Sequence, residues 1–379
     1  MAARGLLSKL LSRSQLGLAR PCSPAWPAGL QQLREIHGTG RKKRPGGGGY
    51  MRTGALPGAP RPPRFLVTGA CGQVGMELVP FLRARFGGDE VIASDIKTSS
   101  REFVDAGPFV YADVQDSDSL ARIVLEHGVD YIVHLASLLS AIGERNPQLA
   151  LKINTNGIQN VLELARLHSL QVFAPSTIAV FGPSTPRDLT PNTTVMEPTT
   201  MYGITKVHLE LLGKYYARVY GVDFRSIRYP GVISSKAMPG GGTTDYAVEI
   251  FHDALRHGTY RCFLDEKQVL PMMYMPDCLE ATVNLMMAPR EKLTQAVYNV
   301  TGMSFTPSDL AAAIRKRRPD FRIVYEPDFR QAIATTWPRT IDDSLARKDW
   351  GWQNKYDIDS MTIDMFEQLQ GRYVIGAAR

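Results

Sequence analysis

From residue 64 onward, short apolar runs alternate with longer stretches whose apolar residues recur at helical spacing. The run "RFLVTG" (64–69) precedes the amphipathic stretch 73–87, and "EVIASD" (90–95) follows it. The same alternation continues to residue 177. Short β-branched runs between helical segments indicate βαβ units. We therefore expect an α/β protein built on a doubly wound parallel sheet.

The second half of the chain begins with the same kind of pattern and then loosens. A helical segment spans 202–220, and "DFRSIRYPGVI" (223–233) is a candidate buried strand. Beyond it come a glycine-rich loop, helices expected near 245–257 and 277–288, and less regular elements to the end. This change predicts a smaller mixed lobe over 236–379 that covers the carboxyl ends of the strands.

The first 64 residues differ from the rest in charge. They hold twelve of the 44 basic residues and one acid, Glu35, so residues 65–379 carry −4 although the whole chain carries +7. Spaced basic residues, serines and leucines on one side of a short helix are typical of a mitochondrial transit peptide. The run "RKKRPGGGG" leaves a disordered basic tail or a nuclear signal open. We assign 1–63 to a transit peptide followed by a flexible Gly/Pro/Arg-rich linker.

Composition also excludes several classes of function. A mildly acidic body does not favour a nucleic-acid surface. The chain has no apolar run of 18 residues, so membrane insertion is not expected. Its cysteines show no CxxC pair and no spacing with histidines that suits a metal, so we expect free thiols and no metal. These cysteines are Cys22, Cys71, Cys262 and Cys278.

A glycine-rich turn follows the first predicted strand and opens the first predicted helix. "FLVTGACGQVG" contains Gly69, Gly72 and Gly75, with Ala70, Cys71, Gln73 and Val74 between them. Glycines at this spacing allow a tight turn and let a pyrophosphate sit on the helix N-terminus. The pattern alone would be a weak signal, because a glycine-rich turn that binds no ligand is the alternative interpretation. The preceding strand and the following helix make it a dinucleotide site of the Rossmann type, which places this site in a domain over 64–235.

The end of the next predicted strand selects the cofactor. Asp95 lies twenty residues after Gly75, where an acid binds the adenosine ribose hydroxyls. Its carboxylate would repel a 2′-phosphate, so we expect NAD, while Lys97 and Arg101 keep NADP open. Asp113, which precedes Val114, could accept from the adenine amino group or could instead cap a helix.

Tyr202 and Lys206 stand four residues apart in "TTMYGITK", a spacing that any helix face shares. Their context is informative, because the chain resembles the extended short-chain dehydrogenase/reductase family over residues 65 to about 235. The matching motifs, in the order of that family, are "TGACGQVG", Asp95, "DV" at 113–114, "VHLAS" at 133–137, "NTNGIQNVLELAR" at 154–166, "PSTIAVFG" at 175–182, "YGITK" at 202–206 and "RYPGV" at 228–232.

The resemblance implies that Tyr202, Lys206 and Thr177 form a catalytic set, with Ser176 assisting. A tyrosine of ordinary pKa is protonated near neutrality, and a lysine ammonium one helical turn away favours tyrosinate, the base that an alcohol oxidation needs. The resemblance also implies further NAD contacts. These are Ile96, Lys97, Leu135, Ala136, Asn154, Lys206, Tyr202 and Val232. Asn154 has an equal alternative as the N-cap of its helix.

The second lobe departs from the family members that bind nucleotide sugars. Where those carry an Arg- and His-containing strand, this chain reads "LPMMYMPDCLEAT" (270–282) and keeps only Asp277. The segments "MPGGGTTDYA" and "TTWPRTIDDSLARKDWGW" resemble instead the branch of the family that oxidises the 3-hydroxyl of L-threonine with NAD, and the basic leader matches its mitochondrial members. That resemblance implies 2-amino-3-ketobutyrate as product, a partner CoA ligase that cleaves it to glycine and acetyl-CoA, and a homodimer formed by helices around "YGITK".

A small zwitterionic substrate requires polar groups for its carboxylate and ammonium. The candidates named from loop position and resemblance are Ser137, Thr177, Thr185, Arg187, Tyr202, Thr244 and Trp337. Arg187 could equally form a surface ion pair, and Trp337 could be a core residue. Two other functions stay open: a nucleotide-sugar epimerase or dehydratase, and a catalytically silent NAD-binding assembly or sensor protein.

Overall fold

The computed structural model describes residues 61–379, except 239, 241, 378 and 379. The chain divides into two units, Met1–Ala59 and Pro60–Arg379, and the account below concerns the second. The transit peptide and linker predicted for 1–63, save their last three residues, lie outside the described residues, as does Cys22. Cys71, Cys262 and Cys278 are free thiols.

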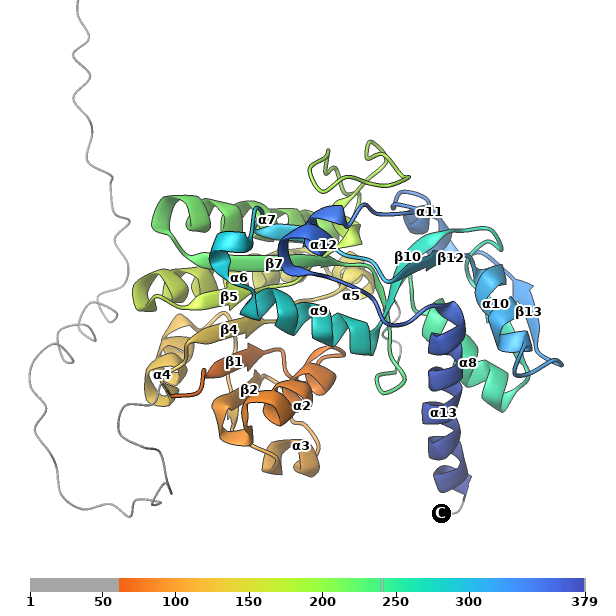
Figure 1. The fold of residues 1–379 in the computed structure, drawn as a ribbon, viewed down its shortest axis with the longest axis horizontal. Helices are drawn as coiled ribbons and strands as arrows, with labels where there is room; N and C mark the ends of the chain where they lie inside the picture. The colour runs from red at the N-terminus through yellow and green to blue at the C-terminus, as the bar shows by residue number, and fades with distance from the viewer. Residues whose placement is uncertain (1–60, 239, 241, 378–379) are drawn as a thin grey trace, which may run out of the picture. The chain divides into compact units, whose positions relative to one another are not determined.

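The centre of the second unit is a parallel sheet (Figure 1). Its strands are β1 (Phe65–Thr68), β2 (Val91–Asp95), β3 (Phe109–Tyr111), β4 (Tyr131–His134), β5 (Gln171–Phe173), β6 (Ser176–Thr177), β7 (Asp223–Tyr229) and β11 (Val297–Asn299). Their order is β11-β7-β5-β4-β1-β2-β3, with β6 beside β7, and every pairing is parallel. The strand order reverses direction at β1, so the doubly wound sheet is confirmed.

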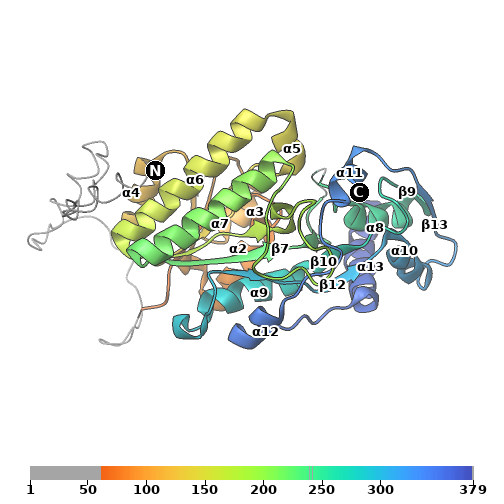
Figure 2. The ribbon, with the colours of Figure 1, turned by 90° about the horizontal axis from the view of Figure 1, so that it is seen from above.

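Helices cover both faces of this sheet. They are α2 (Gly75–Phe86), α3 (Arg101–Asp105), α4 (Ser117–His127), α5 (Ser140–Arg145), α6 (Pro147–His168), α7 (Met201–Tyr220), α9 (Met275–Met287) and α12 (Ser344–Trp350), with short 3-10 turns η1 (Gly88–Glu90), η2 (Ile178–Val180) and η3 (Arg290–Lys292). On one face α4 packs on α6 and α6 on α7, and on the other α2 packs on α9 (Figure 2). Burial on both faces explains why the strands read as continuous apolar runs.

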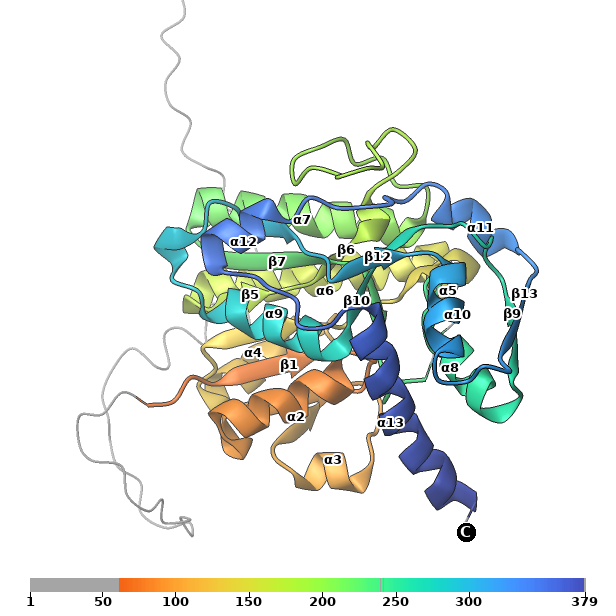
Figure 3. The same cartoon turned by 45° about the vertical axis from the view of Figure 1, so that its right-hand side comes forward.

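The remaining elements form the smaller mixed lobe (Figure 3). Its strands are β8 (Gly231–Ile233), β9 (Thr259–Cys262), β10 (Leu270–Tyr274), β12 (Met303–Phe305) and β13 (Arg322–Tyr325), and its helices are α8 (Tyr246–Arg256), α10 (Pro307–Arg315), α11 (Phe329–Ala334) and α13 (Ile358–Ala377). Strand β10 pairs with β8 in parallel and with β12 antiparallel, while β9 pairs with β13 in parallel. A buried apolar cluster joins α8, α10 and α13 to these strands and to η2.

Residues beyond 235 also contribute to the main sheet and its core. Strand β11 lies at the end of the main sheet, and Trp352 packs in the same buried cluster as Phe65 of β1. Because Pro60–Arg379 forms one unit, a domain boundary at 235 stays a prediction. Among the described residues, the search for a helix with the length and apolarity to cross a bilayer finds none.

Two helix starts differ from the expectation. Helix α6 begins at Pro147, where Asn146 accepts a hydrogen bond from the N–H of Leu149 (3.2 Å), so Asn154 is interior and the N-cap alternative for it is wrong. Helix α4 is capped by Asp116, which accepts from the N–H of Ser119 (3.0 Å), so the cap alternative for Asp113 is also wrong. In both cases another residue, Asn146 or Asp116, stands immediately before the helix and caps it.

Candidate active site

The glycine turn after β1 is required by close backbone packing. Gly69 has φ +71°, and a Cβ there would lie 2.5 Å from the Ala136 nitrogen after β4. A Cβ at Gly75 would lie 2.5 Å from the Gly69 carbonyl oxygen. Both distances are shorter than any van der Waals contact, so the turn brings β1, β4 and α2 together only with glycine at these positions.

This turn borders a cavity of about 310 Å³ at the carboxyl ends of the strands. The cavity therefore lies where open α/β sheets bind ligands. Within the described chain, Val74 at the N-cap of α2 makes no side-chain capping hydrogen bond. The N–H groups of Met76 and Glu77 donate to the backbone carbonyls of Gly72 (2.9 Å) and Val74 (3.2 Å). A helix N-terminus without a capping side chain, directly after the glycine turn, suits the pyrophosphate of a dinucleotide.

Asp95 is held at the end of β2 beside this turn. Its carboxylate accepts from the N–H of Cys71 (2.9 Å) and from the N–H of Lys97 (3.0 Å). Two backbone donors orient the carboxylate and leave it further lone pairs for ribose hydroxyls. Glycines, the uncapped helix and the oriented acid therefore fit NAD, with Asp95 and the turn as the residues that would hold it.

The other predicted adenosine contacts are less constrained. Ile96 and Lys97 are exposed after β2. Asp113 is exposed and accepts from the N–H of Gln115 (2.9 Å), while Val114 is buried. None of the four borders the described cavity, so their roles toward NAD stay predictions.

The start of α7 brings the tyrosine and lysine to the cavity. Thr200 caps the helix by accepting from the N–H of Gly203 (3.1 Å), which places Tyr202 in the first turn. The Lys206 ammonium lies 5.7 Å from the centroid of the Tyr202 ring and donates to the Pro175 carbonyl (2.9 Å). Thr177, at the end of β6, borders the same cavity as Tyr202, and its side chain is near enough to lower the pKa of the Tyr202 hydroxyl. Residues predicted to act together are therefore in contact.

Burial controls the charges of this set. It raises the pKa of Tyr202 to about 12, against the opposing effect of the Thr177 hydrogen bond. It lowers the pKa of Lys206 to about 8, so the lysine is still mostly an ammonium at neutral pH. Beneath them, burial and the nearby Lys206 lower the pKa of His134 to about 3, and its Nδ1 is bonded to the Thr68 hydroxyl (2.9 Å). His134 is therefore neutral and already paired.

Most of the predicted site residues border the cavity. Those that do are Gly69, Gly72, Gln73, Val74, Gly75, Leu135, Ser137, Ser176, Thr177, Tyr202, Lys206, Val232, Thr244 and Trp337. Ser137 has a buried hydroxyl with no partner within the described protein. Trp337 also packs in the apolar cluster of the lobe, so it is a core residue and a cavity wall at once. Ala70 is buried behind the turn.

Two predicted substrate contacts lie outside this cavity. Thr185 accepts from the N–H of Gly182 (3.1 Å) and donates to the Val195 carbonyl (2.7 Å), so its hydroxyl holds its own loop together. Arg187 donates to the Trp337 carbonyl (3.1 Å) rather than forming the surface ion pair that was its alternative. Both act on the loop and wall behind the cavity.

Ser176 and Asn154 also have structural partners. The Ser176 hydroxyl donates to the buried Glu210 carboxylate (2.6 Å), which argues against its direct role in catalysis. Asn154 donates to the Leu138 carbonyl (3.1 Å) and to the Thr205 hydroxyl (3.0 Å), and accepts from the N–H of Leu138 (2.8 Å). It joins the segment after β4 to α7.

Several cavity residues had no individual prediction. They are Leu139, Ser140, Pro175, Ile178, Tyr229, Pro230, Gly231, Gly240, Gly242, Thr243 and Asp245. The "RYPGV" and "GGGTTD" segments contain a signal for some of them. A Cβ at Gly231 would lie 2.8 Å from the Thr244 Cβ, and Asp245 accepts from the N–H of Gly242 (2.7 Å). The small residue at Gly231 allows the segment that contains Thr244 to approach β8 closely.

The fold and this site define an NAD-binding α/β protein, and comparison identifies its family. The model of the NAD dependent epimerase/dehydratase family matches residues 65–301, from β1 through β11, and the chain belongs to that family. The chain is 49% identical over 304 residues to the mitochondrial L-threonine 3-dehydrogenase of Sus scrofa, which covers 80% of this chain and 82% of the relative.

Solved structures show the same relationship. The L-threonine dehydrogenase of Phytophthora infestans is 64% identical, with a TM-score of 0.80, over 82% of this chain and 99% of its own. The holo form of the enzyme from Cupriavidus necator is 51% identical, with a TM-score of 0.79, over 81% of this chain and 100% of its own.

The oriented carboxylate of Asp95 generates the first prediction. Asp95→Ala should weaken NAD binding roughly 10- to 100-fold, because hydrogen bonds from ribose to a charged acceptor are lost. Asp105→Ala, whose carboxylate pairs with Arg101 on the surface, is the control and should bind NAD as the unaltered protein does. Titration calorimetry with NAD measures both, and equal affinities for the two variants would contradict the assignment.

Proposed function

We propose that the protein oxidises the 3-hydroxyl of L-threonine with NAD, giving 2-amino-3-ketobutyrate and NADH. The observation that carries this proposal is the meeting of Tyr202, Thr177 and Lys206 at one cavity that the glycine turn also borders. The names of the similar enzymes from Sus scrofa, Phytophthora infestans and Cupriavidus necator support L-threonine as the substrate.

Each of the three residues has a separate role in the proposed alcohol oxidation. Tyr202 accepts the proton of the 3-hydroxyl while the C3–H bond breaks and the carbon–oxygen double bond forms. The Thr177 hydroxyl orients the substrate oxygen, and the Lys206 ammonium stabilises the tyrosinate. NAD supplies the hydride acceptor when it is bound. A positive charge near Tyr202 is needed because burial alone raises its pKa to about 12.

The cavity also has polar groups for a zwitterion. Among its described lining residues, Asp245 brings a carboxylate, and the hydroxyls of Ser137, Thr243 and Thr244 are available to a carboxylate or an ammonium. Trp337 closes the apolar side, where a methyl group would pack. A few converging polar groups on an apolar wall are typical of sites for small molecules.

The two alternative functions have less support. A nucleotide-sugar enzyme would need cations near 270–282, but this segment is the buried strand β10 and the start of α9. Its Asp277 already accepts from the N–H groups of Lys355 (2.9 Å) and Tyr356 (3.1 Å). A silent NAD-binding protein would need no catalytic set, whereas Tyr202, Thr177 and Lys206 border one cavity here.

A homodimer through α6 and α7 extends the proposal. Ile204, Leu211, Tyr215 and Val219 share one face of α7 and are between 43% and 56% exposed. A stripe of this kind on a helix beside another long helix is suited to a two-fold, four-helix interface with a second copy.

Residues 1–63 and the product suggest the cellular setting. The relative from Sus scrofa is named as mitochondrial, which supports a transit peptide here and a matrix enzyme. A β-keto amino acid decarboxylates readily, so the proposal includes functional coupling to a CoA ligase that cleaves 2-amino-3-ketobutyrate to glycine and acetyl-CoA.

The reaction is tested by following NADH absorbance with the purified protein and L-threonine, other small hydroxy amino acids and UDP-sugars. We expect L-threonine alone to produce NADH, with aminoacetone as the decarboxylated product. Tyr202→Phe should lower kcat about 10²- to 10⁴-fold and leave NAD affinity unchanged, because it removes only the proton acceptor. Tyr220→Phe, on the exposed end of α7, is the control. A lack of threonine turnover by the unaltered protein would refute the proposed reaction. Turnover retained by Tyr202→Phe would refute Tyr202 as the base.

The dimer is tested by sedimentation velocity of the full chain. Leu211→Glu should convert the dimer to monomers, because it places a charge in an apolar interface, whereas Leu125→Glu on α4 should not. A monomeric unaltered protein at micromolar concentration would contradict the proposal, and so would a Leu211→Glu dimer.

The leader is tested by fusing residues 1–63 to a fluorescent protein. We expect import into mitochondria, and its loss when Arg4, Lys9 and Arg13 are replaced by Gln, because import signals depend on spaced basic residues. Nuclear or diffuse fluorescence of the unaltered fusion would support the basic-tail alternatives instead.

A further inference from the structure

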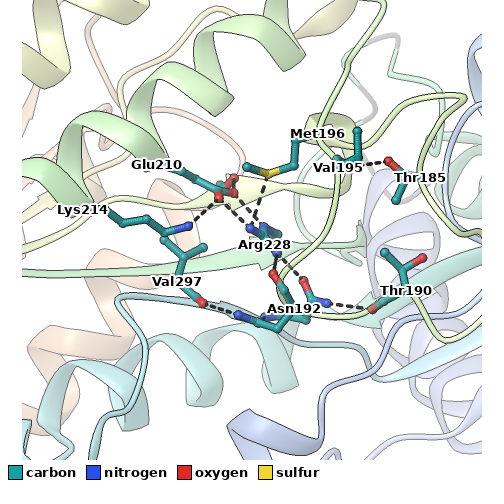
Figure 4. A network of polar contacts seen from close by, with 11 residues as sticks. Thr185, Thr190, Asn192, Val195, Met196, Glu210, Lys214, Arg228 and Val297 are labelled. Carbon is teal, nitrogen blue, oxygen red and sulfur yellow. Dashed lines mark hydrogen bonds and ion pairs between the residues drawn. The ribbon is translucent and has the colours of Figure 1, made fainter.

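Behind the cavity lies a buried ion pair that the proposed reaction does not use. Arg228 of β7 is 1% exposed and Glu210 of α7 is 0% exposed (Figure 4). In the parallel pairing of β6 with β7, Arg228 stands opposite Ser176. The pair therefore lies directly beneath the strand end that carries Thr177.

Every donor of this arginine is in use. Its Nε donates to Glu210 Oε1 (2.8 Å), its Nη2 to Glu210 Oε2 (2.7 Å) and Met196 Sδ (3.5 Å), and its Nη1 to the Asn192 carbonyl (2.7 Å) and Asn299 Oδ1 (3.0 Å). A guanidinium has five N–H donors, so none is left for a substrate. Since neither member of the pair borders the cavity, their effect on the reaction has to be exerted through other residues.

The glutamate connects the strand to the helix. Glu210 Oε1 also accepts from the Ser176 hydroxyl (2.6 Å), and the Lys214 ammonium approaches Oε2 from the solvent side (3.7 Å). Burial favours the neutral acid, but the hydrogen bonds and charge of Arg228 outweigh it, so the pKa of Glu210 is lower than usual. The group is a carboxylate at neutral pH and a strong acceptor for Ser176.

Three consecutive residues, Pro175 and the two residues of β6, contact successive turns of α7. Pro175 accepts from Lys206, Ser176 donates to Glu210, and the Thr177 side chain lies near the Tyr202 hydroxyl, whose pKa it lowers. The helix residues stand four apart and so share one face. A slip of α7 along the strand would break all three contacts together. Two of them, Lys206 to Pro175 and Ser176 to Glu210, are made between buried groups, and only the Ser176–Glu210 contact joins two side chains that the proposed chemistry does not use.

The same arginine anchors the segment between η2 and α7. Asn192, whose carbonyl it holds, donates to the Val297 carbonyl (3.0 Å) and accepts from the N–H of Asn299 (2.7 Å). Figure 4 shows these contacts extending from Arg228 across the loop to Thr190. The chain that joins Thr177 to Tyr202 is thus fixed at its ends and near its middle.

We propose that Glu210, held in place by Arg228, is a positioning residue that sets the register of α7 against β6 and thereby aligns the Tyr202 hydroxyl with that of Thr177. The inference rests on the proposed function for the roles of Tyr202 and Thr177. Small misplacements of reacting groups are costly, since about 1 Å lowers rates on the order of 10²-fold.

Ser176→Ala is the first test, because it separates the strand from Glu210 and leaves the ion pair intact. We expect kcat with L-threonine to fall roughly 10- to 100-fold, while KM and the Kd of NAD change less than about twofold. The midpoint of the pH profile of kcat should not move, since no charge is removed. A rise in KM with unchanged kcat would instead indicate a direct substrate contact and would overturn the proposal.

Because Ser176 also borders the cavity, Glu210→Asp is the second variant. It keeps the charge but shortens the side chain by one methylene, and we expect the same loss of kcat. Lys214→Met is the matched control: it removes another partner of the same carboxylate without touching β6, and kcat should stay at the level of the unaltered protein.

Hydrogen exchange measured by mass spectrometry supplies a readout that does not depend on turnover. Exchange in peptides 175–181 and 201–210 should rise in Ser176→Ala and Glu210→Asp but not in Lys214→Met. Lack of threonine turnover in the unaltered protein would refute the proposed function. The exchange data would then still test whether Glu210 sets the register of α7 against β6. Turnover and exchange in both variants equal to those of the unaltered protein would overturn the positioning role.

Discussion

The docking of α7 against the end of β6 is the contact on which the site depends. Catalysis by a tyrosine and a lysine requires both groups to face a hydroxyl on another element, and no spacing within one helix can supply that. Here Pro175, just before β6, accepts a hydrogen bond from Lys206, and Thr177, at the end of β6, borders the same cavity as Tyr202. The glycine turn and the sheet order then decide what lies opposite them, because β1 and β4 end at the same edge.

The burial that aligns these groups also works against their chemistry. Desolvation raises the pKa of Tyr202 to about 12 and lowers that of Lys206 to about 8, so burial works against the charged form of each group, although Lys206 is still mostly an ammonium at neutral pH. A neutral tyrosine is a poor base. The site therefore depends on charge brought by its ligands, which ties the reactive state of the tyrosine to cofactor binding and protects the resting protein from an isolated buried tyrosinate.

Much of the fold and site was predictable because the signals are local. The strand–glycine–helix order, Asp95, and the Tyr202 and Lys206 pair are each contained in a short stretch of sequence, and the structure brings all of them to one end of the sheet. The sequence could not show that Thr185 and Arg187 lie outside the cavity, because a loop position does not reveal whether a side chain points inward. The ion pair between Arg228 and Glu210 joins a strand and a helix that are eighteen residues apart in sequence, so no periodic pattern predicts it.

Contacts between the 187–190 segment and residues 337–342 have a consequence for the folding of the chain during its synthesis. Thr190 pairs with the 340–342 segment, Arg187 holds the carbonyl of Trp337, and Trp352 fills the cluster that contains Phe65. A nascent chain has made β1 and α7 long before these partners leave the ribosome. Its sheet can pair early, but the cavity wall and the last part of the core arrive together, so the site is completed only after residues 337–352 have been made.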